Sequence, residues 1–138
     1  MSAINESTDD DKIEKRMEPN DIATGDHIFT FQAPSDIYAL AFSRKTPNNL
    51  FKFAIGSFKE TPENTITIVE HKEEERSFNI VQTISTKFPP TKLQWNPSTS
   101  TSDVDILAAS SDSVTIYQYE DQNSVPTLKP KACFTNVS

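Results

Sequence analysis

The stretch Ala39-Leu40-Ala41-Phe42-Ser43 recurs 53 residues later as Lys92-Leu93-Gln94-Trp95-Asn96. At the same offset of 53, Phe53-Ala54-Ile55-Gly56-Ser57 aligns with Ile106-Leu107-Ala108-Ala109-Ser110. Aromatic, aliphatic and small residues therefore return in the same order in two parts of the chain. An internal repeat with a period near 50 residues indicates that the fold is built from similar units.

A third run continues the repeat. Ile66-Thr67-Ile68-Val69 matches Val114-Thr115-Ile116-Tyr117 at an offset of 48, because the second copy has a shorter connection before this run. A fourth and more polar run, Ser77–Ile84, follows in the first copy. Each run is about four to eight residues long and is either alternating or apolar throughout, as strands are. Helical periodicity is not sustained over any comparable window, so we predict an all-β fold.

Four strands in each repeat are typical of a blade of a β-propeller. We predict two such blades, at about residues 36–84 and 91–135. The second strand of each copy is apolar and ends in small residues, which suits a strand buried between neighbouring blades. A β-sandwich or open barrel of eight or nine strands is the alternative, and the constant offset weighs against it because sandwich strands need not recur in order.

The first 26 residues have a different texture. They contain eight acidic and three basic side chains and no aromatic residue. Such a segment cannot bury enough apolar surface to offset the entropy of ordering. We therefore predict a disordered acidic tail at residues 1–26 and a partial propeller at residues 27–138.

The overall composition excludes several classes of function. The chain has 138 residues, a net charge of -7 and 35% hydrophobic residues. Its acidity is unlike that of a nucleic-acid binder, it has no apolar run of about 18 residues for a membrane span, and its N-terminus is not a secretory signal. Cys133 stands alone, which excludes a disulfide framework within one chain and a cysteine-based zinc site. We expect an intracellular protein in which Cys133 is a small buried hydrophobe.

No catalytic chemistry is evident in the sequence. His27 and His71 lie far apart along the chain, beside no nucleophile motif, and two glycines cannot build a phosphate-binding loop. We predict no catalytic, cofactor-binding or metal-binding residues and no small-molecule substrate. His71 and Lys72–Arg76 are interpreted as a solvated hairpin loop and a candidate partner contact. Asp105 and Asp112 are interpreted as residues that end strands and cap turns.

Two Thr-Pro pairs, Thr46-Pro47 and Thr61-Pro62, fall in loops between predicted strands. One interpretation is turn formation, since proline presets the backbone for a turn. The other is phosphorylation by a proline-directed kinase, which makes Thr46 and Thr61 candidate phosphosites.

Several blocks resemble a known family, and they occur in the family's order. They are His27–Pro34, Ile37–Leu40, Ala54–Phe58, Thr91–Pro97 and Leu107–Asp112. On these blocks the chain resembles the WD40-repeat proteins of the plant anthocyanin and trichome regulators (transparent testa glabra type) and their animal and fungal relatives, the cullin-4-associated WD-repeat factors. The similarity covers about residues 27–134.

The resemblance implies WD40-type blades with structural markers at equivalent places. These markers are Phe42, Gly56, Ser57, Trp95, Ser110, Asp112 and Tyr117. Tyr117 stands where the second blade of the family usually has tryptophan, and Ser111 stands where a glycine commonly follows the serine. Because Trp95 repeats the position of Phe42, we expect Trp95 in the core.

The family forms a ring of about seven blades, which needs roughly 300 residues or more. This chain supplies about two blades, and residues 27–33 would form the outer strand that closes the ring. Repeat proteins commonly need at least three units for stability. We therefore expect the isolated chain to be marginally stable and to be a fragment or truncated product of a longer propeller.

The resemblance implies a non-enzymatic scaffold or adaptor in the cytoplasm and nucleus, without cofactors. The implied partners are other proteins: protein kinases, transcription regulators or the adaptor of a cullin-4 ubiquitin ligase. The W-D-x-R motif on which the cullin link normally relies is absent from the sequence. A truncated fragment without independent function is the first alternative, and a hydrolase-type propeller enzyme is the second.

Overall fold

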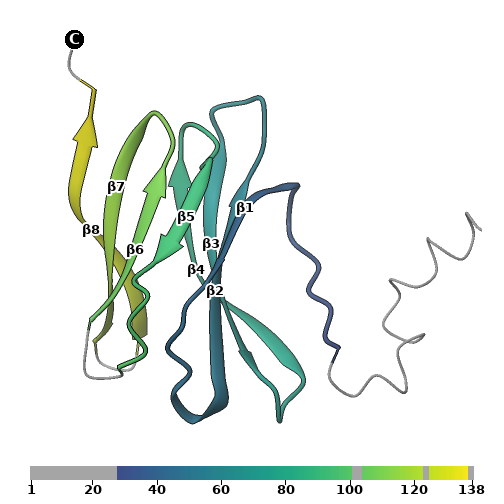
Figure 1. Ribbon diagram of the computed structural model, residues 1–138. Helices are drawn as coiled ribbons and strands as arrows, with labels where there is room; N and C mark the ends of the chain where they lie inside the picture. The colour runs from purple at the N-terminus through teal and green to yellow at the C-terminus, as the bar shows by residue number, and fades with distance from the viewer. Residues whose placement is uncertain (1–27, 101–103, 123–124, 137–138) are drawn as a thin grey trace, which may run out of the picture. The chain divides into compact units, whose positions relative to one another are not determined.

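The computed structural model describes residues 28–100, 104–122 and 125–136 (Figure 1). Within these residues the regular structure consists of eight β-strands and one short 3-10 helix, with no α-helix. The prediction of an all-β fold is therefore confirmed for this part of the chain. The predicted acidic tail at residues 1–26 lies outside the described residues.

The first sheet is a four-stranded antiparallel meander in the order β1-β2-β3-β4. Its strands are β1 Ile37–Phe42, β2 Leu50–Ser57, β3 Asn64–Lys72 and β4 Ser77–Thr86. The 3-10 helix η3, Pro47–Asn49, connects β1 to β2. Asn48 and Asn49 have positive φ angles of 54° and 59°, which asparagine tolerates better than most residues.

The second sheet has the same topology, in the order β5-β6-β7-β8. Its strands are β5 Lys92–Trp95, β6 Asp105–Ser110, β7 Ser113–Gln122 and β8 Val125–Thr135. The sequence placed the last strand at Lys131–Phe134 only. Its first half contains Pro126 and Pro130, which weaken a strand signal but are tolerated on the edge of a sheet.

Strand pairing shows that the sequence repeat is also a repeat of structure. The third and fourth strands of both sheets are offset by a bulge at the same place, between Ile68 and Val69 in β3 and between Ile116 and Tyr117 in β7. These two positions are related by the offset of 48 that the sequence predicts. Bulges tend to be retained as designed features of a fold, so a shared bulge supports structural equivalence of the two sheets.

One part of the sequence alignment is wrong by one residue. Phe42 pairs with Phe53 and its counterpart Trp95 pairs with Leu107, so the second strands are equivalent at an offset of 54 rather than 53. Gly56 therefore corresponds to Ser110. The similarity of the small residues at the strand ends caused the error, which matters because a shift of one residue moves every side chain to the opposite face of the sheet.

Residues 28–33 form no helix or strand. The sequence predicted an outer strand there, paired within the last blade of a ring. The role of residues 27–33 in closing a ring stays a prediction.

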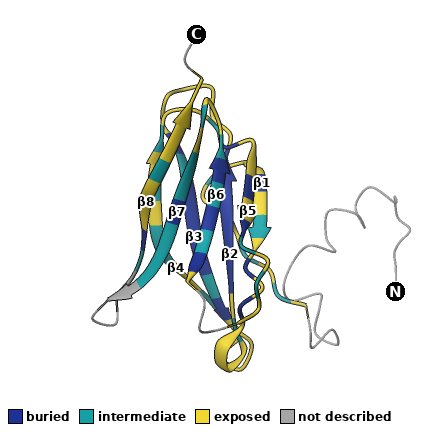
Figure 2. Ribbon diagram, turned by 60° about the vertical axis from the view of Figure 1, so that its left-hand side comes forward, coloured by how far each residue is buried: buried dark blue, intermediate teal, exposed yellow. Residues whose placement is uncertain are grey.

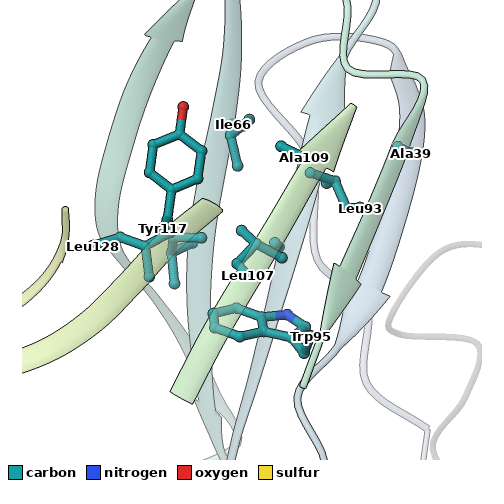
Figure 3. Close-up of a cluster of buried hydrophobic side chains, with 10 residues drawn as sticks. Ala39, Ile66, Leu93, Trp95, Leu107, Ala109, Tyr117 and Leu128 are labelled. Carbon is teal, nitrogen blue, oxygen red and sulfur yellow. The ribbon is translucent and has the colours of Figure 1, made fainter. Parts of the chain in front are cut away.

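The two sheets pack face to face around one hydrophobic core (Figure 3). The first sheet contributes Ala39, Ala54, Ile66 and Ile68. The second sheet contributes the larger side chains Leu93, Trp95, Leu107, Ala109, Tyr117 and Leu128. Figure 2 shows the consequence, with β2 and β3 mainly buried, β6 alternating between buried and intermediate residues, and much of β8 exposed.

Gly56 allows the connection between the sheets to lie close to β2. A Cβ atom at this position would stand 2.9 Å from Cγ and 3.0 Å from Cβ of Pro90, whose side chain is fully buried. Pro90 lies in the segment that leads from β4 to β5. A glycine at this point therefore sets how closely the link between the two repeats can pack.

We expect Gly56→Ala to lower the free energy of unfolding by about 1–3 kcal/mol, because the rigid proline ring cannot move aside without disturbing the packing. Urea denaturation followed by Trp95 fluorescence measures the change. Ser110→Ala at the equivalent place in the second sheet is the matched control and should shift stability by about 0.5 kcal/mol or less. Equal stability of Gly56→Ala and the natural chain would contradict this account.

Candidate functional site

A charged cluster lies between the sheets, where an apolar interface would be expected. The Nζ atom of Lys52 on β2 is 2.9 Å from Oδ2 of Asp105, the first residue of β6. The hydroxyl of Ser43 donates a hydrogen bond of 2.9 Å to the same oxygen. The side chains of Lys52 and Asp105 are only 10% and 5% exposed. A pair this deeply buried holds the two sheets in one relative position, because a sliding movement would separate the charges.

Two aromatic rings complete the surroundings of the Lys52 ammonium. Nζ lies 3.5 Å from the centre of the Tyr119 ring and 5.0 Å from the centre of the Trp95 ring, which are cation–π distances. The Tyr119 hydroxyl donates a hydrogen bond of 3.0 Å to the carboxylate of Glu70. Trp95 Nε1 donates a hydrogen bond of 3.1 Å to the carbonyl oxygen of Ala41. The ion pair of Lys52 and these two hydrogen bonds each join a residue of the first sheet to a residue of the second.

Burial lowers the pKa of Lys52 from its ordinary value of 10.5, while the hydrogen bond and the charge of Asp105 oppose that change. The unfolded chain therefore holds this proton more strongly than the folded chain. Consequently, the contribution of Lys52 to folding stability increases as the pH rises through its lowered pKa towards 10.5. The cluster is mostly shielded from solvent, and its ion pair joins one sheet to the other through Oδ2 of Asp105, whereas Oδ1 is buried without a hydrogen bond. This arrangement suits a structural role in joining the sheets.

A second polar contact joins the outer strands of the two sheets. The backbone N–H of Leu128 on β8 donates a hydrogen bond of 2.6 Å to Oε1 of Gln82 on β4. Gln82 Nε2 in turn donates a hydrogen bond of 3.1 Å to the carbonyl oxygen of Leu128. The amide of Gln82 therefore binds the backbone of the neighbouring sheet at both of its hydrogen-bonding ends.

The side chain of Asn64 organises the loop between β2 and β3, and the sequence analysis missed it. Its Oδ1 accepts hydrogen bonds from the Ser57 hydroxyl and from the Lys59 N–H. Its Nδ2 donates to the carbonyl oxygens of Lys59, Thr61 and Lys87. Asn64 is 1% exposed. It occupies the position of Asp112 at the offset of 48, which is the signal that could have identified it.

The marker residues do not gather at one point. Gly56, Ser57, Trp95 and Tyr117 are buried, with Trp95 4% and Tyr117 8% exposed. Asp112 is exposed in the turn between β6 and β7, where its Oδ1 accepts hydrogen bonds from the hydroxyls of the two flanking serines. The markers thus serve strand ends, turns and core packing.

Phe42 has a different environment from its counterpart Trp95, because it is 59% exposed. It belongs to an apolar surface on the side of the first sheet that faces away from the second, which we name the Phe42 face. Leu40, Phe42, Phe53, Ile55, Val69 and Phe78 make up this face. Leu40 and Phe42 are exposed, whereas Phe53, Ile55 and Val69 are buried, at 7%, 5% and 0% exposure. Phe53 contacts both Phe42 and Phe78, with ring centres 5.1 and 6.3 Å apart.

The second sheet has a matching surface on its side away from the first sheet, which we name the Val114 face. Ile106, Ala108, Val114, Ile116, Ala132 and Phe134 make up this face. Val114 is 39% and Phe134 is 62% exposed. Each sheet therefore has one apolar face in the core and a second apolar face outside it, as expected for a sheet that packs between two neighbours.

Three assignments made from the sequence are wrong. His71 lies within β3 and is 7% exposed, with its ring stacked on Phe78 at 4.4 Å. Only Lys72–Arg76 form the exposed part of the predicted loop. Asp105 begins a strand and forms the buried ion pair. Cys133 is exposed and lies on β8, the edge strand of its sheet among the described residues.

Among the described residues, no group of His, Cys, Asp and Glu side chains is arranged to hold a metal ion. In that part of the chain, no helix is long and apolar enough to cross a membrane.

No family model matches the chain. A relative from Dictyostelium discoideum, described as a DDB1- and CUL4-associated factor 7 homolog, is 33% identical over 110 residues. The match covers 80% of this chain and 33% of the relative, so the chain spans about a third of the length of the relative it matches. The similarity to a cullin-4-associated WD-repeat factor agrees with that part of the resemblance seen in the sequence, and the plant branch of the resemblance stays a prediction.

We expect Lys52→Met to lower the free energy of unfolding by about 3–5 kcal/mol, since it leaves the buried Asp105 carboxylate without its cation. The double variant Lys52→Met/Asp105→Leu removes both charges and should lose much less. Urea denaturation measures both. The surface pair of Lys72 with Glu75, 3.5 Å apart, offers a matched control: Lys72→Met should cost about 1 kcal/mol or less. An equal loss in Lys52→Met and in the double variant would argue against a buried pair.

Thr46 and Thr61 are both exposed, so a kinase can reach them. We expect mass spectrometry to detect phosphate on each of them after treatment with a proline-directed kinase, and to find none on the half-buried Thr65, which precedes no proline. Thr46→Ala and Thr61→Ala should each lose one phosphate. An unmodified chain would leave turn formation as the role of both Thr-Pro pairs.

Proposed function

We propose that the chain forms two blades of a WD40-type β-propeller and acts as a non-enzymatic adaptor in a ubiquitin-ligase assembly of the DDB1 and cullin-4 type. The observation that carries this proposal is the 33% identity over 110 residues to a DDB1- and CUL4-associated factor. A match of 110 residues is longer than either sheet, so it includes residues of both sheets.

The geometry supports the propeller part of the proposal. Both sheets have the same strand order and the same bulge, and they share one hydrophobic core. A sandwich also has two packed sheets, but its outer faces are normally polar because they meet water. Here the Phe42 face and the Val114 face are apolar, which fits blades that have a neighbour on each side.

An adaptor needs a rigid frame that carries accessible loops. The buried pair of Lys52 and Asp105 and the clamp of Gln82 on Leu128 supply rigidity between the sheets. The loops η3 and Lys72–Arg76 are exposed at strand ends and offer side chains to a partner. Kinase and transcription-regulator partners and a location in cytoplasm and nucleus stay predictions from the resemblance.

We expect the purified 138-residue chain to bind purified DDB1 and to compete with the Dictyostelium relative for it. Labelled relative bound to DDB1 would be titrated with unlabelled chain, and its release would be followed by fluorescence anisotropy. Lys52→Met/Asp105→Leu, in which the sheets are no longer held by the ion pair, should compete less well. Trp95 fluorescence shows in parallel that each chain is folded. A folded chain that neither binds DDB1 nor displaces the relative would overturn the proposed function.

A further inference from the structure

We infer that two copies of this chain bind each other along the outer edge of β4, with the two β4 strands antiparallel, so that their first sheets join into one continuous sheet. The inference rests on a single strand and is independent of the adaptor role. It involves neither the Phe42 face nor the Val114 face, because the pairing takes place along the backbone of β4.

The outer edge of β4 is open among the described residues. β4 is the last strand in the order β1-β2-β3-β4, so it is paired on one side only, with β3. None of its ten residues is buried, and the side chain of Ile80 is 51% exposed. Within the described part of the chain, no side chain forms a hydrogen bond to the backbone of residues 79–86. The backbone N–H and C=O groups along such an edge are a template for another strand.

The composition of β4 leaves this edge unprotected. The strand reads Ser-Phe-Asn-Ile-Val-Gln-Thr-Ile-Ser-Thr and contains no charged residue and no proline. Charged side chains and prolines are the usual means by which an edge strand avoids pairing with another chain. A bulge can also disrupt an edge, but β4 and β8 both have one at the equivalent place, so the bulge does not distinguish the two edges.

The outer edge of the second sheet is protected in three ways. β8 contains Pro126 and Pro130, which have no N–H to donate to a neighbouring strand. It also contains Lys129 and Lys131, whose side chains are 50% and 46% exposed. The N–H and the carbonyl oxygen of Leu128 are already bonded to the side chain of Gln82. A strand that approached β8 would therefore meet missing donors, two charges and occupied backbone groups.

The inner edges of both sheets are less suitable than β4. β1 packs against β5, and the carbonyl oxygen of Ala41 on β1 accepts the hydrogen bond from Trp95 Nε1. β5 has four residues and begins with the exposed Lys92. Contacts within one copy thus already occupy part of the inner edges, whereas β4 offers ten residues on its outer side.

A second copy of β4 is the partner that the composition favours. In an antiparallel pair of two β4 strands, every cross-strand pair consists of uncharged side chains, so no like charges meet and no charge is buried alone. The exposed residues of β4 are Asn79, Ile80, Thr83 and Ser85, and pairs of Thr with Thr or Ser are favourable across strands. Both copies use the same edge, so the contact is isologous and closes as a dimer.

The natural chain would be examined by size-exclusion chromatography with light scattering from low to high micromolar concentration. We expect the mass to rise reversibly with concentration from the chain mass of 15.5 kDa to twice that value. Trp95 fluorescence shows in parallel that the chain is folded. A folded monomer throughout that range, or species that grow beyond twice the chain mass, would overturn the inference.

A charge on β4 should prevent the dimer. Ile80→Lys brings two like charges to the shared edge, and its exposed position lets the variant keep the core within each copy. We expect this variant to be a folded monomer at concentrations where the natural chain is a dimer. Phe134→Lys, the same kind of change at a 62% exposed position of β8, is the matched control and should keep the natural mass. Thr83→Lys, also exposed on β4, repeats the test if Ile80→Lys does not fold.

Mixing two variants tests the pairing of one β4 strand with the other. Ile80→Glu alone should also be monomeric, and its equimolar mixture with Ile80→Lys should recover the dimer, because opposite charges then meet across the pair. A mixture that stays monomeric while both variants are folded would overturn the pairing of the two strands.

Two further outcomes would contradict the inference. If Ile80→Lys keeps the mass of the natural dimer, the copies associate through another surface. If Phe134→Lys is monomeric as well, the outer edge of the second sheet takes part in the contact. None of these outcomes bears on DDB1 binding, which is measured separately.

Discussion

The structure depends on the packing of two four-stranded sheets through faces of complementary size. Small and β-branched side chains of the first sheet, such as Ala54 and Ile66, leave room for Trp95 and Leu107 of the second. Without this contact, each meander would expose to water the apolar residues that now form the shared core, which is unfavourable. Neither repeat can therefore be understood as an independent unit.

The buried ion pair of Lys52 and Asp105 favours one orientation of the two sheets relative to each other. Apolar surfaces are tolerant of sliding, because the free energy of burial depends on area and has little directional preference. The pair of Lys52 with Asp105 has a direction, and so do the hydrogen bond from Trp95 to the Ala41 carbonyl and the clamp of Gln82 on Leu128. These contacts join inner, central and outer strands of the first sheet to the corresponding strands of the second.

The repeat was visible in the sequence because each strand is short and its apolar pattern is dense. The strands of both sheets, their order and the core location of Trp95 follow from that pattern. The one-residue error in the second strand arose because similarity of small residues cannot determine which partner each residue faces. Strand pairing determines it, and pairing is a contact between segments that are far apart along the chain. The clamp of Gln82 on β8 was invisible for the same reason.

The sequence by itself determined an all-β chain with two related four-stranded units and no concentrated set of catalytic residues. These properties depend on local pattern and composition, which can be recognised in short stretches of the sequence. Only the tertiary structure decided that Lys52 and Asp105 form a buried pair, that His71 is stacked inside a strand, that Cys133 lies on an exposed edge and that Asn64 holds its loop with five hydrogen bonds. Each of these depends on which side of which strand a residue occupies, and burial on a given side is set by the neighbouring sheet rather than by adjacent residues.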